Sequence, residues 1–111
     1  MKERRPDLAA VCEYAASRFV LLGECTLEKP HSKFTPLKAR TAELQGLLGS
    51  WADVVPVVFT ACEPAAGDFA SASADGIILV GQEKLSGLLR LVATGPKPKE
   101  VLEFLRMMSI F

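Results

Sequence analysis

The sequence has little of what several common classes of protein depend on. It contains three cysteines among 111 residues, far apart and without CxxC spacing, which argues against a disulfide framework and a zinc site. A single histidine argues against a His-based metal centre. No apolar run reaches the roughly 18 residues of a membrane span, and no signal-peptide pattern follows the charged N-terminus. We therefore expect a cytoplasmic protein whose metal ligands, if it binds a metal, are oxygens.

The sequence also has no excess of positive or negative charge. The chain has 13 Lys and Arg residues and 13 Asp and Glu residues, so its formal net charge is +0 at pH 7. An overall basic surface would be the simplest indication of nucleic-acid binding, so such a partner has to be argued from a local patch. No glycine-rich phosphate-binding loop follows any predicted strand, which argues against a nucleotide site.

The residues that are present predict one α/β domain spanning 1–111. Half of them are hydrophobic, which is enough for a single core. Apolar runs predict strands at 7–14, 18–27, 53–61 and 76–81. Helical periodicity and helix-ending residues predict helices at 35–48, about 63–75, 82–92 and 99–108. A hairpin followed by helix–strand alternation predicts a sheet of mixed direction flanked by helices.

Several single residues carry further expectations. Thr35 and Pro36 are typical of a helix N-cap and first position, so they set the predicted start of the first helix. Pro56 inside the third strand indicates an edge or a bulge. We expect Trp51 to fill the core and the Cys25 side chain to be buried. Leu37, Leu44, Leu47 and Leu48 are expected to form the apolar stripe of the first helix.

Glu24 is the most unusual residue of the second predicted strand. Because both faces of that strand are largely apolar, the strand should be central in the sheet and covered on both sides. A carboxylate there is costly unless it is paired or binds a metal. The alternative is a strand end that reaches solvent.

The pattern around Glu24 resembles a known signature. Asp7 in "PD", a hairpin and then "ECT" are similar to the motif of the PD-(D/E)xK, or restriction-endonuclease-like, nucleases. The stretch "VVPVVFTACEPAAGDFASASADGIILVGQEKLSGLL" resembles the end of Mrr-type members of that superfamily. The resemblance covers most of residues 6–92. It implies a restriction-endonuclease-like fold, here without the usual N-terminal helix, and Mg²⁺- or Mn²⁺-dependent hydrolysis of DNA phosphodiesters.

The resemblance also implies site residues. Asp7 and Glu24 would hold the metal, and the backbone carbonyl of Cys25 would complete its shell. The family has a lysine two residues after the strand carboxylate, but Thr26 stands there and cannot supply a positive charge. Variant members supply the lysine from the following loop or helix, and we expect Lys33 in this role, with Lys38 as second choice.

The segment that follows the second strand is a local basic patch. It contains no acid between its first and last cations, and its proposed nucleic-acid contacts are Lys29, Lys33, Lys38 and Arg40. Two alternatives stay open. The domain can be a catalytically inactive member of the same fold that serves DNA binding or protein assembly, or an unrelated small α/β binding module.

The ends of the chain raise a related question. The sequence opens almost directly on a core strand, which indicates either a fragment of a longer protein or a form that dimerises to cover an exposed sheet. The apolar C-terminal segment 97–111, with its predicted helix, also suits a homodimer surface.

Overall fold

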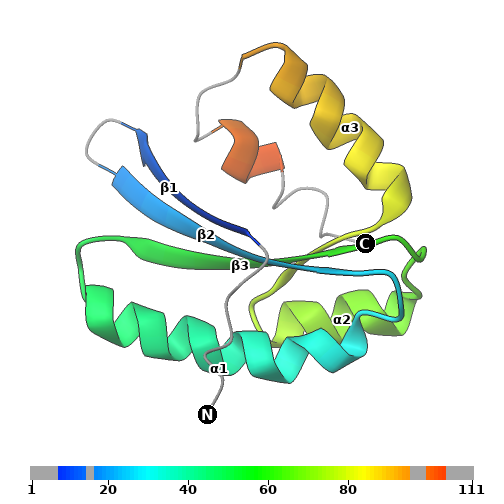
Figure 1. Cartoon of the computed structure of the whole chain (residues 1–111), viewed down its shortest axis with the longest axis horizontal. Helices are drawn as coiled ribbons and strands as arrows, with labels where there is room; N and C mark the ends of the chain where they lie inside the picture. The colour runs from blue at the N-terminus through cyan, green and yellow to red at the C-terminus, as the bar shows by residue number, and fades with distance from the viewer. Residues whose placement is uncertain (1–7, 15–16, 96–99, 105–111) are drawn as a thin grey trace.

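A computed structural model describes residues 8–14, 17–95 and 100–104. The elements are β1 (Leu8–Tyr14), β2 (Ser17–Thr26), α1 (His31–Leu48), β3 (Asp53–Thr60), α2 (Ala66–Ala74), β4 (Ile78–Val80) and α3 (Gln82–Ala93) (Figure 1). Residues 100–104 are also helical, and they form the part of the predicted C-terminal helix that lies within the described residues. Asp7, the first predicted metal ligand, lies outside the described residues.

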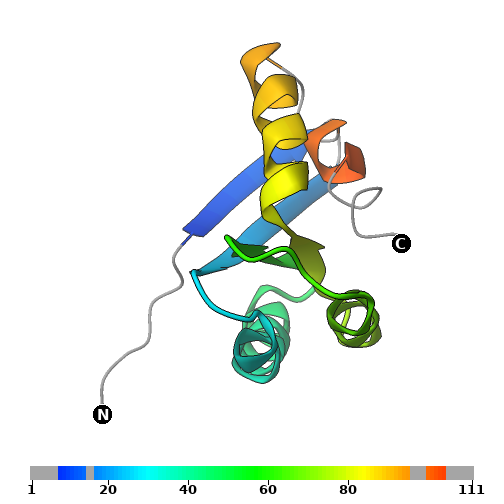
Figure 2. The same ribbon diagram turned by 90° about the vertical axis from the view of Figure 1, so that its right-hand side faces the viewer.

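The described strands form one mixed sheet. Its order is β1-β2-β3-β4; β1 pairs antiparallel with β2, whereas β2 with β3 and β3 with β4 are parallel. Because parallel neighbours need a crossover, α1 and α2 connect them and lie on one side of the sheet. The opposite side is covered by α3 (Figures 1 and 2). The predicted α/β class and the mixed sheet with flanking helices are therefore confirmed.

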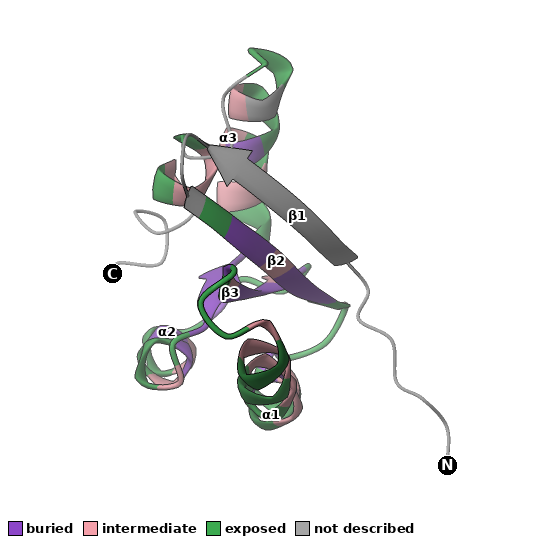
Figure 3. Cartoon of the chain, turned by 90° about the vertical axis from the view of Figure 1, so that its left-hand side faces the viewer, coloured by how far each residue is buried: buried purple, intermediate pink, exposed green. Residues whose placement is uncertain are grey.

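Two apolar clusters hold these layers together, one on each face of the sheet. The cluster under α3 consists of Phe19, Val55, Val57, Ile78, Val80 and Leu88. The cluster facing α1 and α2 consists of Leu22, Phe34, Leu37, Val58, Phe69, Ala72, Ile77 and Leu79. Successive strand residues alternate between the faces, as a pleated strand requires. β2 is thus central and buried on both sides, as its composition predicted (Figure 3).

Helix α1 begins at His31, so the predicted start at Thr35 was wrong. Its N-cap is Pro30, whose φ of −74° already suits a helix, and the Lys33 amide donates to the Pro30 carbonyl at 2.9 Å. Pro36 consequently lies inside the helix. Its missing N–H removes one backbone hydrogen bond of the helix.

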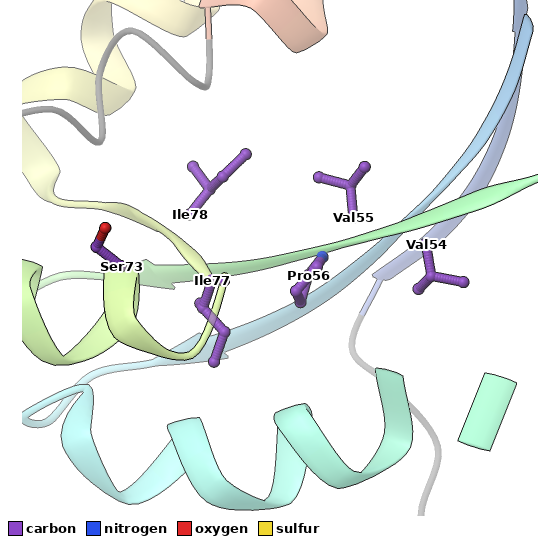
Figure 4. Close-up of a pocket in the computed structure, with 7 residues that line it drawn as sticks. Val54, Val55, Pro56, Ser73, Ile77 and Ile78 are labelled. Carbon is purple, nitrogen blue, oxygen red and sulfur yellow. The ribbon is translucent and has the colours of Figure 1, made fainter. Parts of the chain in front are cut away.

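Pro56 lies in β3, which is an interior strand, but at Pro56 only β2 pairs with β3. β4 pairs only with residues 57–59 of β3, so the preceding half of β3 has no β4 neighbour. A notch of about 210 Å³ lies there, where Val55 and Ile78 point to one face and Val54 and Ile77 to the other (Figure 4). The expectation of an edge was therefore correct for this half of the strand.

Two apolar side chains lie farther out than predicted. Trp51 is 47 % exposed rather than in the core, and the Arg18 guanidinium lies 4.9 Å from its ring centroid. Leu47 is 79 % exposed, so the predicted stripe of α1 reaches the core mainly through Leu37. Leu89 of α3 is exposed as well. Among the described helices, none has the length and apolar character needed to cross a membrane.

Candidate functional site

Glu24 lies near the carboxyl end of β2, and it is only 6 % exposed. It is in register with Val58 of β3 and shares the strand face of Leu22, which belongs to the cluster facing α1 and α2. A carboxylate in such surroundings loses most of its hydration. It therefore needs a charged or hydrogen-bonding partner to stay ionised.

Arg40 of α1 provides that partner. Its Nη1 donates to Glu24 Oε1 at 2.7 Å, and the two side chains are 19 % and 8 % exposed respectively. Arg40 follows the fully buried Leu37 by three positions, so both lie on the side of the helix that faces the sheet. The bond is short and charge-assisted, the strong kind of protein hydrogen bond.

The ion pair does not use every hydrogen-bond donor of Arg40. Nη2 of Arg40 is buried and has no hydrogen-bond partner among the described residues. Glu24 Oε1 accepts from Arg40, and no second donor to this carboxylate occurs among the hydrogen bonds of the described part of the chain. Buried polar groups without partners are rare in folded proteins, so each one requires an explanation.

The three predicted lysines do not join this pair. Lys38 Nζ forms a 3.2 Å ion pair with Asp75 at the end of α2, and its side chain is 61 % exposed. Lys33 is half-buried in the first turn of α1, and Lys29 is exposed in the preceding loop. Of the four predicted nucleic-acid contacts, Arg40 alone is therefore seen in contact with Glu24.

Sequence reasoning assigned Arg40 to a surface role and missed this contact. The signal that could have found it is the spacing within the predicted helix. Arg40 lies three residues after Leu37 and four before Leu44, so it shares the side of the predicted apolar stripe.

Thr26 and Cys25 have local surroundings that bear on their predicted roles. The Thr26 hydroxyl accepts a hydrogen bond from the Glu28 amide at 3.1 Å and so supports the turn after β2. The Cys25 side chain is exposed, contrary to the prediction that it is buried. Cys25 alternates to the face opposite Glu24, and it lies at the strand end where the core gives way to solvent.

A pocket of about 370 Å³ opens beside Cys25, at the carboxyl ends of β2 and β3 and the start of α3. Its lining is mostly apolar and consists of Cys25, Thr26, Leu27, Phe59, Thr60, Ala61, Gln82 and Leu85. Ligands of parallel sheets commonly bind at this edge. The Glu24–Arg40 pair faces the other side of the sheet, so the pocket and the ion pair are separate features.

Lys84, in the "KL" part of the Mrr-like stretch, contacts α2. Its Nζ lies 4.6 Å from the centroid of the Phe69 ring. Desolvation by partial burial lowers the pKa of Lys84, while the carboxylates of Glu63 and Glu83 act in the opposite direction. This lysine is best explained as a contact between α3 and α2.

The described residues supply one half of the predicted metal site. Glu24 offers a hard oxygen ligand, but no group of three possible ligands among His, Cys, Asp and Glu occurs in the part of the chain that the structure describes. A complete site therefore depends on Asp7, outside the described residues. On the described residues alone the fit to a metal is incomplete, and no reaction step is derived through it.

Comparison of the chain with protein-family models, with curated proteins and with solved structures found no match.

Proposed function

We propose that this chain is a restriction-endonuclease-like domain that hydrolyses DNA phosphodiester bonds with Mg²⁺ or Mn²⁺. The observation that carries the proposal is Glu24, a buried carboxylate on a central strand that follows a hairpin and has a guanidinium 2.7 Å away. A charged side chain is seldom buried unless it is paired or binds a metal.

Two further features support this proposal. The antiparallel hairpin of β1 and β2, followed by the parallel strands β3 and β4, agrees with the mixed sheet that the resemblance implies. Arg40 also brings a positive charge to Glu24, which Thr26 cannot do. We therefore assign to Arg40 the cationic role that the sequence analysis gave to Lys33 or Lys38.

In this proposal Asp7 and Glu24 hold the metal, with the Cys25 carbonyl as a third ligand. When bound, such an ion offsets charge on the phosphate and acidifies a water molecule. The chain's own contribution is to place the Arg40 guanidinium against the buried Glu24 carboxylate. Lys29 and Lys33, on the loop and first turn before Arg40, are proposed to attract the DNA backbone.

A second candidate function is favoured by one observation, because the Glu24–Arg40 pair satisfies the buried charge without a metal. The domain would then be a catalytically inactive relative that serves DNA binding or protein assembly. A homodimer through the C-terminal helix or the exposed sheet is one form of such assembly, and it stays a prediction.

The test is cleavage of supercoiled plasmid in Mg²⁺ or Mn²⁺ by the wild type, Glu24→Gln and Asp7→Asn. Arg90→Gln, which changes an exposed cation on α3, is the matched control. We expect nicking or linearisation by the wild type and the control only, with the fold of every variant checked by circular dichroism.

An inactive wild type would refute the nuclease. Calorimetry with Mn²⁺ then examines the site itself, since an inactive domain whose carboxylates are only structural should show no metal binding that depends on Glu24 or Asp7.

A further inference from the structure

We propose that Arg40 is a receptor for a phosphate oxyanion and binds it without any metal ion. Glu24 holds the guanidinium through Nη1, and the ligand accepts from Nη2. The inference rests on the proposed function for the source of the phosphate, a nucleic-acid backbone, but its chemistry is independent of cleavage.

The starting point is the unpartnered Nη2 of Arg40, which is buried without an acceptor among the described residues. A buried donor without a partner costs about 1–3 kcal/mol, and more when it belongs to a charged group. An acceptor supplied by a ligand would remove that cost. Phosphate is the natural acceptor because its anionic oxygens accept strong, charge-assisted hydrogen bonds from a guanidinium N–H group.

The Arg40 side chain is the part of the pair that lies nearer to solvent. The Arg40 side chain keeps 19 % of its surface exposed, whereas that of Glu24 keeps 8 %, so the cation is the outer member of the pair. Nη2 itself is covered, and a ligand must displace the atoms over it. Binding of a small free anion should therefore be weaker than binding of a polyanion that makes additional contacts.

The surrounding helix favours an anion over a cation. The first turn of α1 carries no acidic residue, while Lys33 lies in that turn and Lys29 precedes it. Lys38 is already paired with Asp75, so it is the least available of these cations. The segment from Lys29 to Arg40 contains no acid, and the carboxylate that contacts Arg40 is that of Glu24. This carboxylate limits how strongly Arg40 can attract an anion.

Removing the charge of Glu24 should therefore raise the affinity of Arg40 for phosphate. Glu24→Gln removes the negative charge but keeps a side chain that can accept a hydrogen bond from Nη1. Phosphate binding at Arg40 should then become at least about tenfold tighter, equivalent to about 1.4 kcal/mol. The same substitution is expected to abolish metal-dependent cleavage, so the two proposals fail independently.

The experiment follows two sets of NMR resonances in EDTA: the Arg40 side-chain N–H groups, where Arg40 is present, and the backbone amides of β2 and α1 in every protein. Inorganic phosphate and, separately, a short single-stranded oligonucleotide are titrated in. The proteins are the wild type, Glu24→Gln, the double variant Glu24→Gln/Arg40→Gln, and Arg90→Gln as control. The double variant joins two neutral amides that can hydrogen-bond, so it keeps the fold testable where Arg40→Gln alone leaves Glu24 buried and unpaired.

We expect saturable shifts of the Arg40 resonances in the wild type, tighter binding in Glu24→Gln, no change in Arg90→Gln, and loss of site-specific binding in the double variant. Response to both probes identifies a general phosphate receptor, and response to the oligonucleotide alone identifies a backbone contact. Absence of a response to either probe would overturn the proposal, as would equal affinity of Glu24→Gln and the wild type.

Discussion

Separating Glu24 from Arg40 should weaken the fold far more than breaking an exposed ion pair on the same helix. At 4 Å and an effective dielectric constant of about 20, two unit charges attract by about 4 kcal/mol, and desolvation offsets part of this. Removing one member of a buried pair typically costs about 3–5 kcal/mol. Because Arg40 is 19 % exposed, we expect the lower end of that range, about 3 kcal/mol.

The assay is urea unfolding of four proteins: the wild type, Glu24→Gln, Arg40→Met, and the double variant Glu24→Gln/Arg40→Met. With a denaturant slope of about 1.5 kcal/mol per molar urea, a loss of about 3 kcal/mol lowers the midpoint by roughly 2 M. The single losses should not add, because the double variant leaves no buried unpaired charge. We expect a coupling free energy of about 1–3 kcal/mol in the cycle.

The pair of Lys38 and Asp75 is the matched control, since it also starts from α1. Its atoms lie 3.2 Å apart, but the two side chains are 61 % and 27 % exposed. Lys38→Met should therefore cost less than about 1 kcal/mol, and the loss should shrink in high salt. A Glu24–Arg40 coupling below about 0.5 kcal/mol, or one as sensitive to salt as the control, would refute the reasoning that this pair is buried and structurally essential.

Two further predictions concern the frame that positions the site. Gln45→Ala should destabilise the fold by about 2 kcal/mol, because the Gln45 side-chain amide makes three hydrogen bonds of 2.9–3.0 Å to backbone groups of residues 49–54. Gln45→Glu should keep the bond that the side chain accepts and so lose less stability than Gln45→Ala. Unfolding of both variants in urea measures the two losses. Gly81→Ala should lower the free energy of unfolding by about 1–3 kcal/mol, because the new Cβ would lie 2.6 Å from Pro64 Cδ. Gly46→Ala should not destabilise the fold, because the space around its Cβ is open. Thermal melts in which Gly46→Ala is the less stable variant would contradict this packing.

The sheet was predictable because each strand carries its own evidence. Buried parallel strands read as continuous apolar runs, and "DVVPVVFT" and "ILV" are of this kind. Alternation along β2 also placed Glu24 on the correct face, opposite Phe19. These properties depend on residues adjacent in sequence, so they can be read locally.

The partner of Glu24 was not predictable in the same way. The contact joins residues 16 positions apart on a strand and a helix, and it depends on the rotation of α1 about its own axis. Packing of Phe34 and Leu37 against the sheet sets that rotation, and such packing cannot be deduced from neighbouring residues alone.

The rotation of α1 about its axis decides which cation contacts Glu24. Leu37 faces the core, Arg40 faces Glu24 and Lys38 forms an ion pair with Asp75. A guanidinium also differs from the ammonium that the family motif places after the strand carboxylate. It stays charged when partly buried, and it can hold a carboxylate with one nitrogen while another remains available. One arginine can therefore neutralise Glu24 in the resting fold and still offer a second nitrogen to a phosphate in a fixed planar geometry, which the compact ammonium of a lysine does not provide.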